Sequence, residues 1–253
     1  MQIRHIQFGG QDIALCGRQG DSYFDHAVPD EPFAFAMRVL PDEAVVFDIG
    51  SNIGMTAVVA AKQGTAKVYA FEPDPNVFPF LLDTIKANAA LVDAHNIALG
   101  ANEGSLSFFS NSDSASASHL VTADTLGHSP TGTVQMSTFD AFVDTHHIDK
   151  IDFIKIDVEG FEIDVLRGGR ETIERLKPSL LIEFNAFTMV GFRDINPRDL
   201  LRLLRDIFPN VYRFKAGQPL LIDSDHAALT FLHDNLVSAG CVDDLYCSFR
   251  PIG

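Results

Sequence analysis

A short turn with two glycines constrains the fold of this chain more than any other segment. Residues 48–54 read DIGSNIG and follow an apolar run at 44–48, while residues 55–63 have the length of a helix and are rich in Ala and Val. A continuous apolar run of this length fits a strand that is buried on both faces of a sheet. Because glycine lets the backbone turn tightly and approach a ligand, the segment predicts a strand, a ligand-binding turn and a helix in succession.

The middle of the chain repeats this succession of strands and helices. Helices are expected at 76–90, 161–167 and 197–207. Strands are expected at 67–72, 95–99, 105–109, 151–157, 179–184, 211–214 and 244–249. Alternation of this kind builds a mostly parallel sheet with helices on both faces, which places the chain in the α/β class.

Two regions depart from the alternation. Residues 1–40 show no clear pattern beyond a helix at 30–40, so we expect an N-terminal extension packing on a core domain of residues 41–253. Residues 110–133 form a polar insertion rich in Ser and Thr. A loop of this length in a compact domain is either a surface loop or a lid over a substrate, and the sequence leaves both interpretations open.

The balance of charge excludes several classes of partner. The 253 residues include 34 Asp and Glu against 19 Lys and Arg, a net charge of −15. Nucleic acids and anionic membranes bind to concentrated basic faces, so we expect neither as a partner. No apolar run is long enough for a secretory signal or a membrane span, and three Cys are too few for a disulfide framework. These features predict a cytoplasmic protein without a membrane span.

The predicted turn and the strand after it favour a nucleoside ligand of positive charge. Glu72 ends that second strand, where an acid can accept hydrogen bonds from both hydroxyls of a ribose. The turn has the spacing G-x-x-x-G rather than the G-x-G-x-x-G of dinucleotide sites, and it begins with Asp48, which would repel a pyrophosphate. S-adenosylmethionine (SAM) has a ribose, a sulfonium and an ammonium but no phosphate. A nicotinamide-dependent oxidoreductase and a non-catalytic module that binds SAM or a nucleoside remain the alternatives.

Four segments together resemble a known enzyme family. VVFDIGSNIG (45–54), VYAFEPDP (68–75), NIAL (96–99) and especially FIKIDVEGFEIDVLRGG (153–169) look like the FkbM family of SAM-dependent methyltransferases. The resemblance covers about residues 44–214 and leaves out the polar insertion and residues 1–40. It implies a class I methyltransferase fold, a Rossmann-like sheet of about seven strands. It also implies O-methylation, that is, transfer of a methyl group to a hydroxyl of a sugar, a macrolide or a glycolipid.

The candidate cofactor residues follow from the turn, the ends of two strands and the NIAL segment. They are Asp48, Gly50, Ser51, Asn52, Gly54, Glu72, Pro73, Asn96, Ala98 and Asp157. Since ligands of open α/β sheets lie at the carboxyl ends of the strands, Asp48 and Asp157 are expected to face one cleft.

Three acids are the candidate catalytic residues. Alternation along the strand at 151–157 places Asp157 and Glu159 on the same side of the sheet edge, and Glu183 ends the next strand. We expect Asp157 beside the methionine moiety and the acceptor oxygen, with Glu159 and Glu183 binding or deprotonating the acceptor. Glu162, by contrast, lies where a helix is expected to begin, a position at which the helix dipole favours an acid. Lys155 can pair with one of these acids.

Other assignments for this site stay open. The general base is alternatively one of His119, His128, His146 and His147. The three candidate acids also suit Mg²⁺, although nothing in their spacing demands a metal. The expected acceptor is a small molecule or glycan, a carbohydrate or glycosylated natural product. No Lys or Arg occurs between Lys86 and Lys150, so an acceptor bound mainly by the polar insertion would be uncharged. An exposed strand at the C-terminal edge would permit a homodimer.

Overall fold

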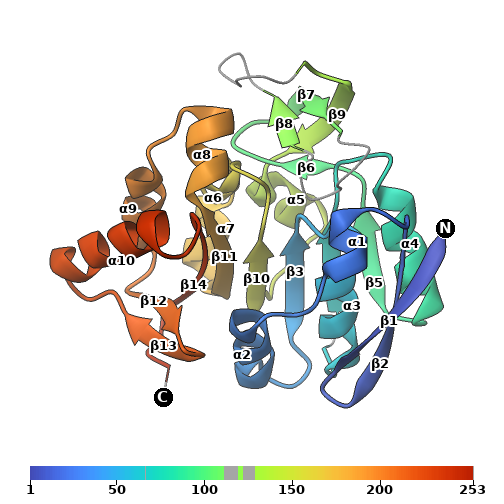
Figure 1. The fold of residues 1–253 in the computed structure, drawn as a ribbon, viewed down its shortest axis with the longest axis horizontal. Coiled ribbons are helices and arrows are strands. Elements are labelled where there is room, and N and C mark those ends of the chain that lie inside the picture. The colour runs from blue at the N-terminus through green and yellow to red at the C-terminus, as the bar shows by residue number, and fades with distance from the viewer. Residues whose placement is uncertain (66, 111–118, 122–128, 253) are drawn as a thin grey trace.

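The structure is a computed structural model that describes residues 1–65, 67–110, 119–121 and 129–252. Its centre is an eight-stranded sheet in the order β13-β12-β14-β11-β10-β3-β4-β5 (Figure 1). The parallel strands are β3 (Val45–Ile49), β4 (Lys67–Phe71), β5 (Val92–His95), β10 (Phe153–Ile156) and β11 (Ser179–Asn185). The antiparallel strands are β12 (Asn210–Lys215), β13 (Gln218–Leu221) and β14 (Val242–Ser248). This arrangement confirms the expected α/β fold with a mostly parallel sheet.

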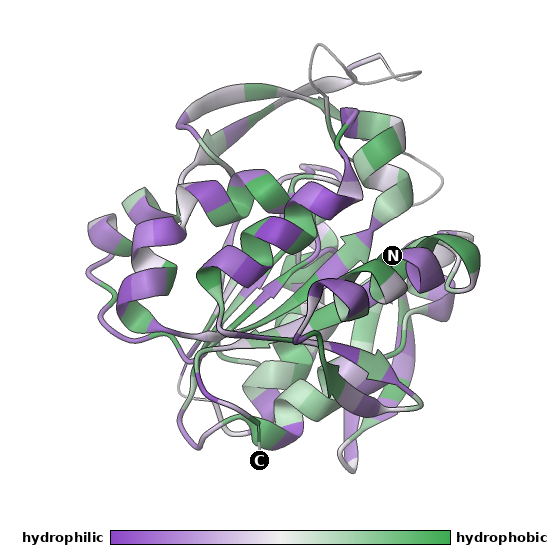
Figure 2. Cartoon of the chain, turned by 90° about the vertical axis from the view of Figure 1, so that its left-hand side faces the viewer, coloured by the Kyte–Doolittle hydropathy of each residue, from purple (hydrophilic) through white to green (hydrophobic). Residues whose placement is uncertain are grey.

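Helices cover both faces of the sheet, so the central strands are apolar on both sides. Adjacent residues of β3 illustrate this, because Val46 contributes to one core and Phe47 to the other. One core contains α2 (Glu31–Val39), α3 (Met55–Lys62) and α4 (Phe78–Ala87). The other contains α5 (Phe139–Thr145), α6 (Glu162–Gly168), α7 (Arg170–Leu176), α8 (Ala186–Arg193), α9 (Pro197–Ile207) and α10 (Asp225–Val237). Figure 2 shows largely hydrophobic strands inside and helices, several of which carry both hydrophilic and hydrophobic residues.

The segment 95–99, which was expected to be one strand, is divided between two strands. The chain leaves the main sheet after β5, and β6 (Ala98–Leu99) belongs to a separate four-stranded sheet. The polar side chain of Asn96 explains the break, since its Nδ2 donates to the carbonyl oxygens of Glu72 (2.8 Å) and Pro73 (3.0 Å) beyond the end of β4. The chain thereby crosses the end of β4.

The second sheet lies over the carboxyl ends of β3 and β10 (Figure 1). Its order is β6-β9-β7-β8, with β7 (Gly104–Phe109), β8 (His119–Val121) and β9 (Gly132–Ser137). Its apolar side includes Phe108 and Leu120, which pack with Phe161 of the main domain. Most of the polar insertion, at 111–118 and 122–128, lies outside the described residues.

Residues 1–40 form a hairpin and two helices. The hairpin consists of β1 (Gln2–Phe8) and β2 (Gln11–Gly17), and α1 (Ser22–His26) and α2 follow it. Strand β2 packs on α4, where the Cys16 amide donates to Thr84 Oγ1 (2.9 Å). Among the described residues, no helix combines the length and apolar character that crossing a bilayer requires.

Candidate active site

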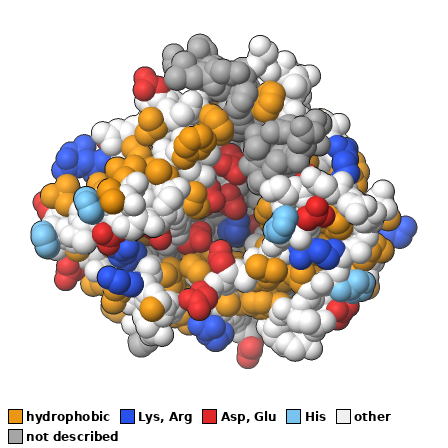
Figure 3. Space-filling view, in the orientation of Figure 1, with side chains coloured by type: hydrophobic (Ala, Val, Ile, Leu, Met, Phe, Trp, Pro, Cys, Tyr) orange, Lys and Arg blue, Asp and Glu red, His pale blue; other side chains and the backbone are white. Residues whose placement is uncertain are grey.

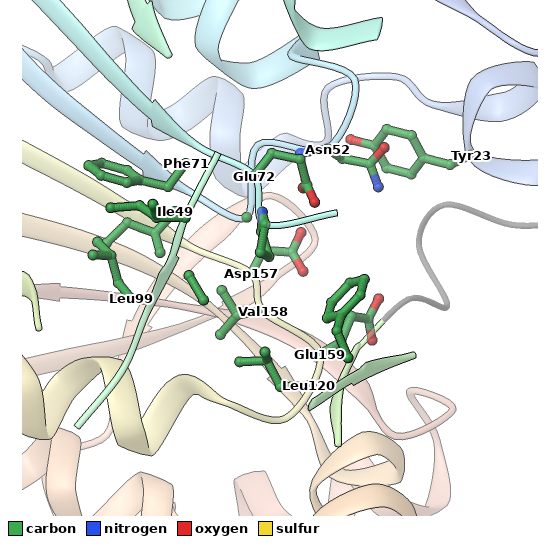
Figure 4. A pocket seen from close by; sticks show the side chains of 15 residues that line it. Tyr23, Ile49, Asn52, Phe71, Glu72, Leu99, Leu120, Asp157, Val158 and Glu159 are labelled. Atoms are coloured by element: carbon green, nitrogen blue, oxygen red, sulfur yellow. The ribbon is translucent and has the colours of Figure 1, made fainter. Parts of the chain in front are cut away.

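A pocket opens at the carboxyl ends of β3, β4 and β10, beneath the second sheet (Figure 4). It spans about 670 Å³ of space, including space open to solvent. Its walls include seven of the residues that the sequence indicated: Gly50, Asn52, Glu72, Pro73, Ala98, Asp157 and Glu159. The strands therefore bring the turn, the second-strand acid and the Asp157 segment together around one cavity.

The turn approaches its neighbours so closely that two positions require glycine. Gly50 has a φ of +87°, and a Cβ there would lie 1.8 Å from the carbonyl oxygen of Asp157. Gly54 has a φ of +88°, and its Cβ would lie 2.5 Å from Leu81 Cδ1. These two glycines let β3 and β10 meet at the pocket and let α3 start directly after the turn.

Glu72 presents its carboxyl group on the wall beside the turn. Its two oxygens accept hydrogen bonds from the backbone amides of Asn52 (2.9 Å) and Asp74 (2.8 Å). Burial raises the pKa of Glu72 to about 8, although those two amides oppose the shift. The carboxyl oxygens keep further lone pairs that can accept hydrogen bonds from the hydroxyls of a ligand.

Asp48 and Ser51 lie behind the turn rather than on the pocket wall. The Asp48 side chain is 2% exposed, and its Oδ2 accepts a hydrogen bond from Thr56 Oγ1 (2.6 Å). The Ser51 hydroxyl donates to the Asp48 carbonyl oxygen (2.7 Å) and accepts from the Phe71 amide (3.1 Å). In this structure both residues thus hold the shape of the turn, and Asn96 does the same for the end of β4.

Lys155 separates the two aspartates that the sequence placed in one cleft. It is paired in register with Asp48 across β3 and β10, and its Nζ lies 2.9 Å from Asp157 Oδ2. Burial raises the pKa of Asp48, while the Lys155 ammonium acts in the opposite direction. Asp157 itself reaches the pocket with 31% of its side chain exposed.

Carboxylates gather on the other side of Asp157. One oxygen each from Asp157, Glu159 and Glu183 can be chosen so that all three lie within 4.8 Å of one another. Burial, and next the charge of Asp157, raise the pKa of Glu159 to about 9 and that of Glu183 well above its usual value. Figure 3 shows acidic side chains in the central hollow of this face. The group can take up a proton or attract a cation.

Glu162 supports the turn that carries Glu159. It is 1% exposed, and its Oε1 accepts hydrogen bonds from the amides of Gly160 (3.1 Å) and Val158 (3.3 Å). Glu159 has a φ of +52°, a conformation that few residues other than glycine adopt without support. Glu162 therefore occupies the helix start that the sequence suggested, while Glu159 projects into the pocket.

The histidines that were alternative bases do not line the pocket where the structure describes them. His146 stacks on Phe142 with ring centroids 4.0 Å apart, and its Nδ1 lies 2.8 Å from the Phe142 carbonyl oxygen. His147 is exposed. His128 and the side chain of His119 lie outside the described residues.

The sequence matches a family over the region that builds this pocket. Residues 48–214 match the family model described as Methyltransferase FkbM domain. The chain belongs to this family. The match confirms the resemblance to this family that the DIGSNIG turn and the KIDVEG segment indicated.

Two curated relatives and one solved structure are similar to this FkbM-family chain. Over 174 residues it is 28% identical to the hexuronic acid methyltransferase AglP of Haloferax volcanii, which covers 67% of this chain and 66% of the relative. Over 147 residues it is 29% identical to Methyltransferase 1 of Beauveria bassiana, covering 51% and 59%. The matched stretches thus span less than two thirds of either relative. A crystal structure of Methyltransferase FkbM from Methylobacillus flagellatus KT has a TM-score of 0.52 at 20% identity and covers 89% of this chain and 49% of that one, which supports the fold.

Several pocket residues of this FkbM-family chain were not found from the sequence. Phe108 and Leu120 come from the second sheet, and Tyr23 comes from α1, outside the family match. Phe108 lies in a strand that was expected, but only the pairing of β7 with β8 and β9 places it over the pocket. Tyr23 lies in a segment without a recognisable pattern, so no sequence signal indicated it.

Proposed function

We propose that this chain transfers a methyl group from SAM to a hydroxyl oxygen of a carbohydrate or glycosylated natural product. One observation carries the proposal: a single pocket of this FkbM-family chain has Glu72, an acid placed to bind a ribose, on one wall and the acids Asp157 and Glu159 on another. The first wall suits a nucleoside, and the second suits a cationic centre beside a hydroxyl that must lose its proton.

The walls of the pocket fit the parts of SAM. The carboxyl group of Glu72 can accept hydrogen bonds from the two ribose hydroxyls. Apolar residues surround the neighbouring space, where an adenine ring would be shielded from water; they include Pro73, Ile97, Ala98, Phe108 and Leu120. The negative charge of Asp157 favours the sulfonium end. SAM supplies a methyl group that is already activated for displacement.

The hydrogen bonds of the turn argue against the nicotinamide alternative. A dinucleotide needs free backbone amides for its pyrophosphate. Here the amides of Gly50 and Ser51 donate to the Phe71 carbonyl oxygen, and that of Gly54 donates to Ser51. The amides of Asn52 and Ile53 donate to the Glu72 and Asn52 side chains. All five turn amides are therefore bonded within the protein, which supports SAM over a nicotinamide dinucleotide.

Carboxylates near the expected acceptor position can take up the hydroxyl proton that the reaction releases. When the acceptor oxygen attacks the methyl carbon, a carbon–oxygen bond forms, the carbon–sulfur bond breaks and the hydroxyl proton must leave. Glu159 lies on the pocket, and Glu183 has an oxygen within 4.8 Å of it. Either carboxylate can take the proton in its ionised form, and a raised pKa makes it a stronger base.

A neutral polyhydroxylated acceptor fits the pocket better than an anionic one. The relative AglP is described as a hexuronic acid methyltransferase, which supports a sugar as the class of acceptor. No Lys or Arg is among the described residues that line the pocket, whereas three carboxyl groups are. A uronate carboxylate would meet repulsion from Asp157 without a Lys or Arg on the described pocket wall.

Magnesium dependence is a second hypothesis for the same site. The oxygens of Asp157, Glu159 and Glu183 are hard ligands of the type Mg²⁺ binds, and one oxygen of each can be chosen so that all three lie within 4.8 Å of one another. Turnover after exhaustive treatment with EDTA tests this hypothesis: loss of activity that Mg²⁺ restores supports it, and full activity without divalent ions contradicts it.

The function is tested by supplying methyl-labelled SAM together with a panel of neutral sugars, uronates and fractionated cell extract. Mass spectrometry should find the label on a hydroxyl of a neutral glycan, with release of S-adenosylhomocysteine. Tight binding of NAD without binding of SAM would favour the oxidoreductase. Binding of SAM without turnover on any fraction would favour the non-catalytic module.

A further inference from the structure

One pocket residue comes from the N-terminal segment that precedes the FkbM match. Tyr23 of α1 lines the pocket, and Figure 4 shows its ring pointing toward Asn52 of the glycine turn. The family match starts at residue 48, so Tyr23 is a feature of this chain beyond the matched domain. Tyr23 can therefore contact the part of a ligand that lies beside the glycine turn.

Several contacts fix α1, and with it Tyr23. Asp21 Oδ1 caps the helix by accepting from the amides of Tyr23 (2.9 Å) and Phe24 (3.0 Å). The ring of Phe24 is 3% exposed and lies against Gly17, where a Cβ would come within 2.2 Å of it. The guanidinium of Arg4 donates to the carbonyl oxygen of Ala27 just after the helix. Tyr23 is thus preorganised at the pocket.

The methionine part of SAM ends in an α-carboxylate that needs hydrogen-bond donors. The backbone amides of the glycine turn cannot supply them, because all five donate within the protein. Among the described lining side chains, the amide of Asn52 and the hydroxyl of Tyr23 are the groups with an N–H or phenolic O–H. Asn52 Oδ1 accepts from Ile53, which leaves its Nδ2 for a ligand.

The surroundings of Tyr23 keep its hydroxyl in the protonated form. Burial raises the pKa of Tyr23, so its hydroxyl keeps its proton and can donate. The ammonium of Lys155 acts on Tyr23 in the opposite direction, while the charges of Asp157, Asp48 and Asp30 add to the rise. A hydrogen bond from a protonated hydroxyl to a carboxylate is charge-assisted and therefore stronger than a neutral one.

We propose that the hydroxyl of Tyr23 and Nδ2 of Asn52 donate hydrogen bonds to the α-carboxylate of the methionine part of SAM. The N-terminal segment is then part of the cofactor site, and Tyr23 selects ligands that carry the amino-acid end. The proposal rests on the proposed use of SAM.

Two ligands that differ at this end test it. S-adenosylhomocysteine has the amino-acid moiety, and 5′-methylthioadenosine lacks it. The variant Tyr23→Phe keeps the ring and removes only the hydroxyl. We expect it to bind S-adenosylhomocysteine about ten- to a hundredfold more weakly in calorimetry, while its affinity for 5′-methylthioadenosine changes less than twofold.

The matched control is Tyr212→Phe, which removes a hydroxyl that accepts from the Ile252 amide far from the pocket. This control should bind both ligands as the original protein does, and both variants should keep the original melting temperature within a few degrees. Equal weakening of both ligands by Tyr23→Phe, or weakening of neither, would overturn the role of Tyr23. If the original protein binds neither ligand, the proposed use of SAM fails first.

Discussion

Gly50 is the residue at which the turn and strand β10 come closest. A Cβ at this position would lie 1.8 Å from a backbone oxygen of Asp157, which no side-chain movement can relieve. The left-handed φ of +87° adds its own strain for any other residue. The geometry of this pocket wall thus depends on the absence of a side chain at Gly50.

Gly50→Ala should therefore unfold more easily and lose binding of SAM. We expect a loss of at least about 2 kcal/mol in the free energy of unfolding, from backbone strain and the clash together. Urea denaturation and calorimetry with SAM measure the two effects. Gly191→Ala is the control, since a Cβ there meets nothing within 4 Å and the site lies in α8. Binding of SAM by Gly50→Ala at the original affinity would contradict this account of the turn.

The proposed role of Glu159 as general base predicts a pH dependence of the reaction. Burial raises its pKa to about 9, and a general base works only in its ionised form. The fraction of ionised Glu159 therefore grows as pH rises, so kcat/KM should increase through neutral pH and level off only above about pH 9.

The variant Glu159→Gln tests this assignment. It should lower kcat by about 100-fold or more and abolish the rise with pH, with little effect on SAM affinity. A full pH profile of kcat/KM is the measurement. A rise with pH that survives in Glu159→Gln but disappears in Glu183→Gln would move the role of base to Glu183.

At the scale of elements, the pairing of β3 with β10 places Lys155 between two acids. Asp48 lies beside it in register, and Asp157 Oδ2 is 2.9 Å from its ammonium. The Lys155 side chain is 13% exposed, so water screens these charges poorly. One lysine thus compensates acids from two neighbouring strands.

Lys155→Met should leave both acids without compensation. We expect a loss of about 3–5 kcal/mol in the free energy of unfolding at neutral pH, with partial recovery at low pH as Asp48, whose pKa burial raises, takes up a proton. Lys67→Met is the control, because its ion pair with Asp93 is nearly half exposed and should contribute less than about 1 kcal/mol. Equal losses in the two variants, measured by urea denaturation, would show that the Lys155 position is not special.

Elements with a local signal were predictable, and those defined by distant contacts were not. The strand before DIGSNIG and the helix at 197–207 followed from apolar patterns within a few residues. The break between β5 and β6 depends on Asn96 bonding to carbonyl oxygens at the end of β4, a contact that no local pattern reveals. For the same reason the sequence found Glu72 and Asp157 but not Tyr23, which reaches the pocket only through the packing of α1.

At the scale of the whole molecule, the N-terminal hairpin belongs to one of the two cores. Ile13 and Leu15 of β2 are fully buried in the core that contains α3 and α4. The hairpin was missed in the sequence because its apolar residues find their partners far along the chain. Its burial implies that it unfolds together with the sheet.

Leu15→Ala tests that cooperativity. We expect a loss of about 2–5 kcal/mol in a single urea transition, seen alike by fluorescence and circular dichroism. Ile3→Ala is the control, since Ile3 is 53% exposed on the hairpin and its change should cost less than about 1 kcal/mol. A separate early transition for Leu15→Ala would indicate a hairpin that detaches by itself.

The position of β14 in the sheet determines where the chain can be truncated. The strand spans Val242–Ser248, beyond the FkbM match, yet in the sheet it lies between β11 and β12. A fragment that ends at residue 214 would lose a strand from the interior of the sheet and leave β11 and β12 each with an open edge. Open edges pair with other chains, so such a fragment should aggregate, whereas removal of the few residues after β14 should not. For recombinant work, a fragment designed from the family match would therefore be too short to fold, because the folded sheet needs the strand that ends at Ser248.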